Sequence, residues 1–277
     1  MLLFAYSVRD PAGRGIAKAL TSILGLELRS GGAGELVEYV KERDFALAGF
    51  DAEPTNLDSI EAYFPSIDFV IVLSRHSSAA GVPSLTVHHT GNFGSEAPYG
   101  GRPFELGIAN PPVAKAMLKS LAALAPEGFE VSYEATHHGP TSLSAPLTFI
   151  EIGSTEEEWT RRDLHEIVAR AALQALEIRR GDLKTSCRPC IGVGGGHYPK
   201  KHTALSLETD LCYGHIISKR VVSLLSPEEF ERALEMCASR CKPRPVALVV
   251  EKKSVRSSYR KLASSWAARV GLEYLEV

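Results

Sequence analysis

Short apolar runs alternate with segments of helical periodicity along most of this chain. Phe45–Phe50 and Phe69–Ser74 are two of the runs that we predict as strands. The second is continuously apolar, which is typical of a strand in a sheet that is covered on both faces. Segments 12–24 and 112–124 instead show the spacing of helices. This alternation indicates an α/β protein, and we predict a three-layer α/β/α sandwich with a mixed, mostly parallel sheet.

The 277 residues could fill one large domain or two ordinary ones. Neither an internal repeat nor a low-complexity linker divides the sequence, so we predict a single domain over residues 1–277. A capping box, either Ser154 with Glu157 or Thr155 with Glu158, predicts one long helix that ends near Gly181. Further strands are expected at 2–7, 85–89, 130–136, 147–152, 190–193, 246–250 and 273–277, and further helices from 226 and over 256–270.

Charge is distributed unevenly although the formal net charge is only −2. Residues 240–270 contain nine Lys or Arg against a single acid, Glu251. Such a stretch is a candidate face for a polyanion, and a solvated helix surface is the alternative interpretation. No apolar run approaches the roughly 20 residues of a membrane span, and the start reaches Arg9 too early for a secretory signal. We therefore expect a cytoplasmic protein without a membrane partner.

Thermolabile residues are scarce, because Asn occurs only at 56, 92 and 110 and Gln only at 174. This depletion indicates a heat-adapted source, in which intracellular disulfides are tolerated. Cys187 and Cys190 form a C-x-x-C motif, whereas Cys237 and Cys241 lie one turn apart in a predicted helix. The four make a poor zinc site, so we interpret the cysteines as structural, either bridged or buried as thiols.

Six of the nine histidines fall in segments at or just after predicted strands. A single His at a strand end is usually structural, but six in one α/β domain favour a functional site. Adjacent residues on a strand point to opposite faces, so His88 and His89 cannot both line one pocket. The segments are 74–77, 87–92, 133–140, 149–154 and 192–198.

Imidazole and carboxylate groups together suit zinc in an open catalytic site. The candidate ligands by residue type are Glu134, Glu151, His137, His138 and His197, although no H-E-x-x-H spacing supports them. The glycines at 194–196 allow a ligand to approach the backbone closely. They belong neither to a P-loop nor to a dinucleotide fingerprint, because no Gly-Lys-Ser/Thr follows and His197 replaces the third glycine.

The same segments resemble motifs of the archaeal-type D-aminoacyl-tRNA deacylase family. The motifs are Ser-Arg-His-Ser at 74–77, His88 with Thr-Gly-Asn at 90–92, Tyr-Glu-Ala-Thr-His-His-Gly-Pro at 133–140, Phe-Ile-Glu-Ile-Gly-Ser at 149–154, Gly-x-Gly-Gly-Gly-His-Tyr at 192–198 and Gly-His-Ile at 214–216. The resemblance implies a phosphorylase/hydrolase-like fold, similar to peptidyl-tRNA hydrolase, and zinc-dependent hydrolysis of the ester between a D-amino acid and the 3′ end of tRNA. His89 and His202 stand where the family pattern has no His, so we leave both out of the site.

The expected site follows from this reaction. Zinc bound by His and Glu would activate a water molecule and polarise the ester carbonyl. We expect the tRNA acceptor end as the partner and no obligate protein partner. The expected metal ligands are Glu134, His137, His138 and His197, and the further catalytic residues are His88, Asn92 and Glu151. Asn92 and the backbone amides of residues 194–196 are expected to hold the oxyanion or the amino acid. The expected substrate-binding residues are Arg75, His76, Gly194, Gly195, Gly196, Lys253, Arg256 and Arg260, of which the last three are expected to form a stripe along one face at the start of the last helix.

Two other classes of protein remain open from the residues alone. A nucleoside phosphorylase or nucleosidase would use the same fold, with Arg75 and Arg102 available for phosphate. A non-catalytic RNA-binding module is supported only by the basic stretch at 240–270, because the chain has no RNP-like or KH-like motif.

Overall fold

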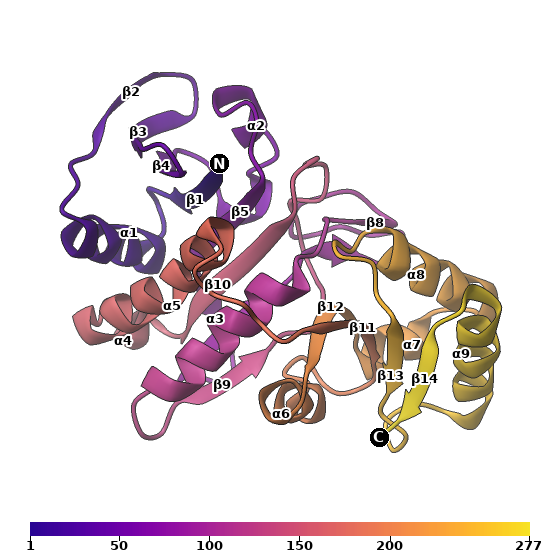
Figure 1. Ribbon diagram of the computed structural model, residues 1–277. Helices are drawn as coiled ribbons and strands as arrows, with labels where there is room; N and C mark the ends of the chain where they lie inside the picture. Colours follow the sequence, from indigo (N-terminus) through magenta and orange to yellow (C-terminus); the bar gives the residue numbers. More distant parts are fainter.

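A computed structural model describes residues 1–277 apart from the side chain of Ala33. Its larger sheet has eight strands in the order β2-β3-β4-β1-β5-β10-β6-β9. Four of the seven neighbouring pairs are parallel, which confirms the predicted mixed, mostly parallel α/β architecture (Figure 1). The strands are β1 (Leu2–Ser7), β2 (Arg29–Ala33), β3 (Leu36–Lys41), β4 (Phe45–Phe50), β5 (Phe69–Ser77), β6 (Ser84–His88), β9 (Glu130–Tyr133) and β10 (Leu147–Ser154).

Helices cover both faces of this sheet. The amphipathic helices α1 (Pro11–Leu24), α3 (Pro111–Leu124) and α5 (Arg162–Arg180) bury their apolar sides against one face. The short helix α2 (Ile60–Tyr63) and the segment around Leu143 and Ala145 cover the other face. Because β1, β4 and β5 are enclosed on both sides, their sequences are almost continuously apolar.

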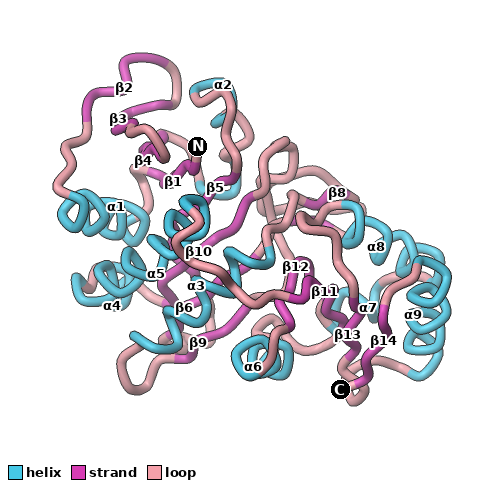
Figure 2. Tube along the Cα trace, viewed as in Figure 1, coloured by secondary structure: helices cyan, strands magenta, loops and turns pink.

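The strands of the last third form a separate parallel sheet in the order β12-β11-β13-β14. They are β11 (Arg188–Val193), β12 (Leu211–Ile217), β13 (Ala247–Val250) and β14 (Glu273–Glu276), accompanied by helices α6 (Lys200–Glu208), α7 (Lys219–Leu224), α8 (Pro227–Ser239) and α9 (Ser257–Val270). Figure 2 shows α8 and α9 beyond this sheet, on the side away from α3. One apolar core includes Phe4 of β1, Val113 of α3 and Tyr213 of β12, so it joins the two sheets.

The predicted long helix after β10 is in fact two helices. The box of Thr155 and Glu158 opens α4 (Glu156–Trp159), and Arg161 is extended before α5 begins. The prediction of one helix is wrong because Trp159 is anchored, its indole donating to the carbonyl of His76 at 2.9 Å. The second capping signal, Ser226 with Glu229, starts α8 as predicted.

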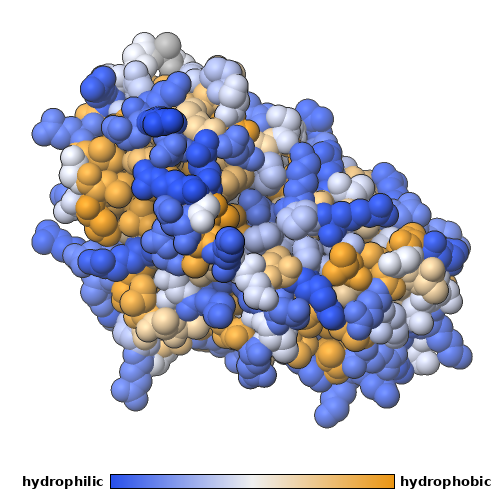
Figure 3. Space-filling view, in the orientation of Figure 1, coloured by the Kyte–Doolittle hydropathy of each residue, from blue (hydrophilic) through white to orange (hydrophobic). Residues whose placement is uncertain are grey.

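The remaining elements are short connections. They are the 3-10 helix η1 (Pro54–Asn56) and a two-stranded ribbon of β7 (Gly91–Asn92) and β8 (Glu105–Leu106). Among the described residues, none of the helices is long and apolar enough to cross a membrane. The face seen in Figure 3 is mainly hydrophilic, with apolar residues in scattered patches.

The five cysteines are buried or bridged. Cys187 and Cys212 form a disulfide that ties the segment before β11 to β12. Cys190, Cys237 and Cys241 are buried free thiols. The structural interpretation of the cysteines agrees with this arrangement.

Candidate active site

Seven side chains from five segments of the chain meet at one place, which we call the His/Glu centre. Strands β5, β6 and β10 supply one residue each, the segment after β9 supplies three, and the loop after β11 supplies one. The members are His76, His88, Glu134, His137, His138, Glu151 and His197. Most of them are the residues that the sequence places in the metal or catalytic set.

The strand pairing explains how these residues meet. Strands β5 and β10 are parallel, with Glu151 beside Ser74, whereas β6 runs antiparallel to β10, with His88 beside Phe149. Since alternate residues of a strand share a face, Glu151 and His88 lie on the same face two positions apart. The His88 Nε2 atom is 3.5 Å from Glu151 Oε2. The centre therefore lies on a face of the sheet, at the junction between a parallel and an antiparallel pair.

Glu134 lies in the middle of the centre and is buried. Its Oε1 atom is 3.0 Å from His76 Nδ1, and its Oε2 atom is 2.8 Å from His197 Nε2 and 3.4 Å from His137 Nε2. Within the described residues, neither oxygen has a partner with hydrogen-bond geometry. Short distances without that geometry are expected when nitrogen and oxygen lone pairs point to a common position rather than to one another.

The backbone fixes which nitrogen of each histidine is free. His137 Nδ1 lies 2.8 Å from the carbonyl of Ala135, and His138 Nδ1 lies 2.6 Å from that of Gly139. An N–H group that donates to these carbonyls leaves a lone pair on Nε2, which is the tautomer of a metal-binding imidazole. His88 Nε2 also lacks a hydrogen-bond partner among the described residues.

Three groups of ligand atoms each fall within 4.8 Å of one another and fit a metal ion by type and spacing. They consist of His88, His137 and His138, of His76, Glu134 and His197, and of His88, Glu134 and Glu151. Imidazole and carboxylate donors suit zinc among the divalent metals. The sequence expected His137, His138, His197 and Glu134 as ligands, and the geometry adds His76 and His88 as candidates.

Burial and neighbouring charges shift the ionisation of the centre. Burial by itself lowers the pKa of His76, but its contacts with Glu134 and Glu151 raise that pKa to about 11. Burial raises the pKa of Glu134, yet His197 and His76 hold it well below its usual value. Burial and the neighbouring His138 lower the pKa of His137. The carboxylates are thus ionised while His137 stays neutral, which is the state in which both kinds of side chain bind metal.

Two further residues support the centre and are absent from the sites expected from sequence. Ser74 donates its hydroxyl to Glu151 Oε1 at 2.9 Å, and the Tyr198 hydroxyl is 2.6 Å from His76 Nε2. Both lie in segments that the sequence analysis singles out. The sequence offers no signal for their roles, because a contact between residues 122 positions apart depends on the tertiary fold.

Two of the three glycines at 194–196 cannot donate to a substrate as expected. The Gly194 amide donates to the carbonyl of Ile217 at 2.8 Å, and the Gly195 amide donates to Ser254 Oγ at 2.9 Å. Their positive φ angles of 103° and 81° turn the chain so that His197 reaches Glu134. We therefore revise Gly194 and Gly195 from substrate donors to positioning residues, while Gly196 lines a cleft beside His197.

Asn92 and Arg75 also differ from expectation. The Asn92 side-chain amide donates to the carbonyls of Gly100 and Arg102, at 3.0 and 3.3 Å. Because both donors are used, Asn92 holds the 99–102 loop and is not available to stabilise an oxyanion. Arg75 lines a cleft of about 480 Å³ that opens onto the centre, and its guanidinium is 3.8 Å from Glu53. This position suits the expected role in substrate binding.

Three other histidines are structural, as the sequence indicates for two of them. His89 Nδ1 is 2.8 Å from the carbonyl of Gly214, and its Nε2 accepts from the Asn110 amide at 3.0 Å. His215 Nε2 lies near the carbonyls of Gly107 and Arg240, at 3.1 and 3.0 Å. His202 is buried against the ring of Tyr213.

The basic residues of the C-terminal third do not form the expected helical stripe. Arg256 is the extended residue before α9, and Lys253 lies in the preceding turn. Both are exposed, whereas the Arg260 guanidinium pairs with both carboxylate oxygens of Glu276 at 2.9 Å. The expectation of a continuous stripe is wrong because the helix begins only at Ser257.

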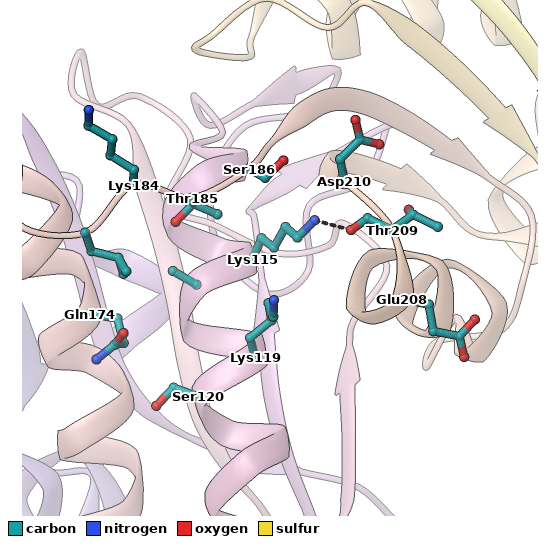
Figure 4. A pocket seen from close by; sticks show the side chains of 12 residues that line it. Lys115, Lys119, Ser120, Gln174, Lys184, Thr185, Ser186, Glu208, Thr209 and Asp210 are labelled. Carbon is teal, nitrogen blue, oxygen red and sulfur yellow. Dashed lines mark hydrogen bonds between the residues drawn. The ribbon is translucent and has the colours of Figure 1, made fainter.

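A separate cleft of about 590 Å³ lies between α3, α5 and residues 183–186 (Figure 4). Its buried Lys115 donates to the carbonyls of Thr209 and Leu211, at 2.6 and 3.1 Å. The ammonium group therefore binds the end of α6 and the start of β12. None of the seven residues of the His/Glu centre lines this cleft, so we assign it a structural role.

Comparisons with known proteins agree with the motifs. A family model described as D-aminoacyl-tRNA deacylase matches residues 63–275, which include the whole His/Glu centre. A D-aminoacyl-tRNA deacylase of Staphylothermus marinus is 46% identical, over 98% of each chain. The protein of that name from Desulfurococcus amylolyticus is 44% identical, over 99% of this chain and 100% of the relative. A crystal structure of a conserved protein of unknown function aligns with a TM-score of 0.87 and 31% identity, over 100% of this chain and 95% of that chain.

Proposed function

This chain belongs to the D-aminoacyl-tRNA deacylase family, and we propose that its His/Glu centre hydrolyses the ester between a D-amino acid and the 3′ end of tRNA. The products are the free D-amino acid and an intact tRNA, so the reaction removes the wrong enantiomer before translation. Family membership selects this activity over the nucleoside phosphorylase and RNA-binding alternatives. We propose a cytoplasmic location, because the proposed substrate, aminoacyl-tRNA, is used there in translation.

We further propose that zinc is the cofactor. The observation that carries this proposal is that both buried oxygens of Glu134 and the buried Nε2 atom of His88 have no hydrogen-bond partner among the described residues. The Nε2 atom of the partly exposed His137 lies 3.4 Å from Glu134 Oε2 and belongs to the same cluster of candidate ligands. Leaving such atoms unsatisfied costs about 1–3 kcal/mol each, and a bound cation removes that cost. Zinc, when bound, supplies a Lewis acid for the carbonyl and lowers the pKa of a water molecule.

Glu151 is the residue best placed to move a proton. Its Oε1 atom is held by Ser74 at 2.9 Å, while Oε2 faces His88 and His76 at 3.5 and 3.6 Å. It removes a proton from the attacking water, and the new C–O bond forms at the ester carbonyl. When the bond to the ribose oxygen breaks, the same carboxyl returns the proton to that oxygen. Atoms balance as one water added across one ester.

The experiment compares Glu134→Gln with Glu130→Gln, a control carboxylate at the start of β9, the strand that ends just before Glu134; among the described residues its ion pair is with Lys200. We expect Glu134→Gln to lose most of the bound zinc and at least about 10²-fold in release of D-amino acid from D-aminoacyl-tRNA. Glu130→Gln should match the wild-type protein in both. Full activity after complete removal of metal by a chelator would refute the zinc proposal, and wild-type protein without deacylase activity would refute the reaction itself.

A further inference from the structure

Three clefts are each lined by residues of the His/Glu centre. The first, of about 480 Å³, includes Arg75, Phe149 and Glu151. The second, of about 610 Å³, shares Tyr99, His137 and His138 with the first and continues to Leu224, and we call it the Tyr99 cleft. The third, also about 610 Å³, includes His197, Lys219 and residues 77–80, and we call it the Lys219 cleft.

An aminoacyl ester at the end of tRNA has three arms that diverge from the reacting carbonyl and ribose. One is the amino acid, one is the terminal base, and one is the phosphodiester that leads to the preceding nucleotide. A centre that hydrolyses this ester must therefore accommodate an arm in each of three directions. The three clefts match that number, and the lining residues that they do not share differ enough to assign the arms.

The Tyr99 cleft contains the two most exposed large apolar side chains described. Tyr99 is 71% exposed and Leu224 is 73% exposed, whereas the other exposed large apolar side chains reach at most 48%. Single exposed apolar residues are ordinary on a protein surface. Two large exposed apolar side chains in one cleft beside a catalytic centre instead indicate a binding surface for a flat, apolar group.

The Tyr99 side chain projects from a fixed backbone. Its carbonyl accepts a hydrogen bond from the Gly139 amide at 3.1 Å, next to His138, and Asn92 holds the carbonyl of Gly100 at 3.0 Å. Gly100 and Gly101 adopt φ angles of 80° and 74°, which a residue with a side chain rarely adopts. An aromatic ring on a rigid loop loses little entropy when a base stacks on it.

Charge separates the base from the phosphate. Arg220 is exposed and lines both the Tyr99 cleft and the Lys219 cleft, so it lies at their boundary. Glu96 and Glu229 line the Tyr99 cleft itself. Carboxylates there repel a phosphate and accept hydrogen bonds from an amino group such as that of adenine, whereas Arg220 and Lys219 attract the phosphodiester.

We propose that the Tyr99 cleft binds the terminal adenine of tRNA, stacked on Tyr99, and that Arg220 binds the phosphate that joins this nucleotide to its neighbour. The proposal rests on the proposed function, because it takes the 3′ end of tRNA as the ligand. Stacking on an aromatic side chain contributes about 1–3 kcal/mol per base, which corresponds to roughly 5–150-fold in affinity.

The first test measures binding and needs no hydrolysis. Deacylated tRNA with its complete 3′ end is compared with the same tRNA lacking the terminal adenosine. We expect Tyr99→Ala to weaken binding of the complete tRNA by about 10-fold and to leave the shortened tRNA unchanged, with most of the loss restored in Tyr99→Phe. Val246→Ala, which trims another exposed apolar side chain, is the control and should affect neither. Equal weakening of both tRNAs by Tyr99→Ala would overturn the proposal, as would no weakening of either.

The second test separates the three arms by kinetics. On a D-tyrosyl ester of adenosine, which has the base but no phosphate, Tyr99→Ala should lower kcat/KM about 10-fold and Arg220→Gln should match the wild-type protein. On D-tyrosyl-tRNA, both Tyr99→Ala and Arg220→Gln should lower kcat/KM. The control variant Arg162→Gln, which removes an exposed charge at the start of α5, should leave kcat/KM unchanged. If the loss in Tyr99→Ala instead grows from D-alanyl to D-tyrosyl esters, the cleft holds the amino acid and the proposal is wrong. A different outcome would overturn only the proposed reaction: Tyr99→Ala weakens binding of the complete tRNA as expected, but the wild-type protein releases no amino acid from D-aminoacyl-tRNA.

Discussion

The last residue of β6, His88, and the residue that follows it, His89, belong to two different kinds of buried histidine cluster. His88 belongs to the His/Glu centre, whereas His89 packs beside His215, with ring centroids 6.0 Å apart. In the His89–His215 pair, each ring nitrogen lies within hydrogen-bond distance of a backbone group or a hydroxyl. In the centre, His88 Nε2 and both Glu134 oxygens have no such partner among the described residues. Burial alone thus does not identify a functional histidine, nor does a single unsatisfied ring, since both nitrogens of the buried His202 also lack partners among the described residues. The His/Glu centre differs because unsatisfied atoms of several imidazole and carboxylate groups lie within 4.8 Å of one another.

The charge states follow the same division. Burial and the neighbouring His215 lower the pKa of His89 to about 3, and burial lowers that of His215 to about 4, so both stay neutral. Burial also lowers the pKa of His88, but Glu151 outweighs it and raises that pKa above its ordinary value. The carboxylates of the centre therefore attract positive charge, whereas the His89–His215 pair excludes it.

The largest expected effect comes from replacing each of the two neighbouring histidines by alanine in turn. His88→Ala should lower deacylase activity by at least about 10²-fold and change the melting temperature little. His89→Ala should leave a cavity and two unpaired backbone groups, and lower the free energy of unfolding by about 3 kcal/mol. Activity per folded molecule should remain. Thermal denaturation measures the stability of each variant, and single-turnover hydrolysis measures its deacylase activity. If the two variants lose activity and stability to the same extent, the functional distinction between His88 and His89 is wrong.

The next effect concerns acid. The pKa of His215 is about 4 in the fold against 6.5 in its ordinary state, so the unfolded chain binds a proton more readily. His215 therefore contributes full stability above about pH 6.5, and this contribution is lost as the pH falls toward 4. The difference amounts to about 3 kcal/mol at the acid end. Chemical denaturation between pH 7.5 and 4.5, in a chelator that keeps metal out of the centre, should show a flatter profile for His215→Gln. An unchanged profile would show that His215 is not held neutral.

A smaller effect tests a contact remote from both clusters. The disulfide joins Cys187 to Cys212, which are 25 positions apart in the sequence. Its reduction should lower the free energy of unfolding by no more than about 2–4 kcal/mol. The rate of hydrolysis should not change, because neither cysteine lines a cleft at the centre. Cys187→Ser should reproduce the result. Loss of zinc in that variant would instead place a metal at the cysteines.

The smallest effect concerns the exposed basic residues near the Gly194 loop. Neutralising Lys253 or Arg256 should raise KM for D-aminoacyl-tRNA and reduce the slope of log affinity against log salt by about 1 each. Arg260→Gln should affect binding less, since that guanidinium is paired with Glu276. Hydrolysis of a D-aminoacyl ester without tRNA is the control. If Arg260→Gln has the larger effect on salt dependence, the paired residue is the one that binds tRNA.

Local sequence signals predicted much of the fold. Helix starts at Pro11 and Pro111 and the capping box at Ser226 lie where local chemistry places them, because a cap depends on residues within one turn. The hairpin of β2 and β3 and the elements α6 and β12 were not predicted, and the small sheet was not separated from the large one. These depend on contacts between distant segments, which periodicity does not report.

The sequence by itself determined the kind of chemistry available and the separation of His88 from His89. Residue types limit the possible metal ligands, and alternation along a strand is a property of the backbone. Only the tertiary structure decided which ligands meet, because that required the antiparallel pairing of β6 with β10 and a turn that brings His197 from the small sheet to Glu134. It also decided that the Gly194 and Gly195 amides and the Asn92 side chain are already hydrogen-bonded. Whether a donor is free depends on partners that can lie anywhere in the chain, and a single sequence carries no record of those pairings.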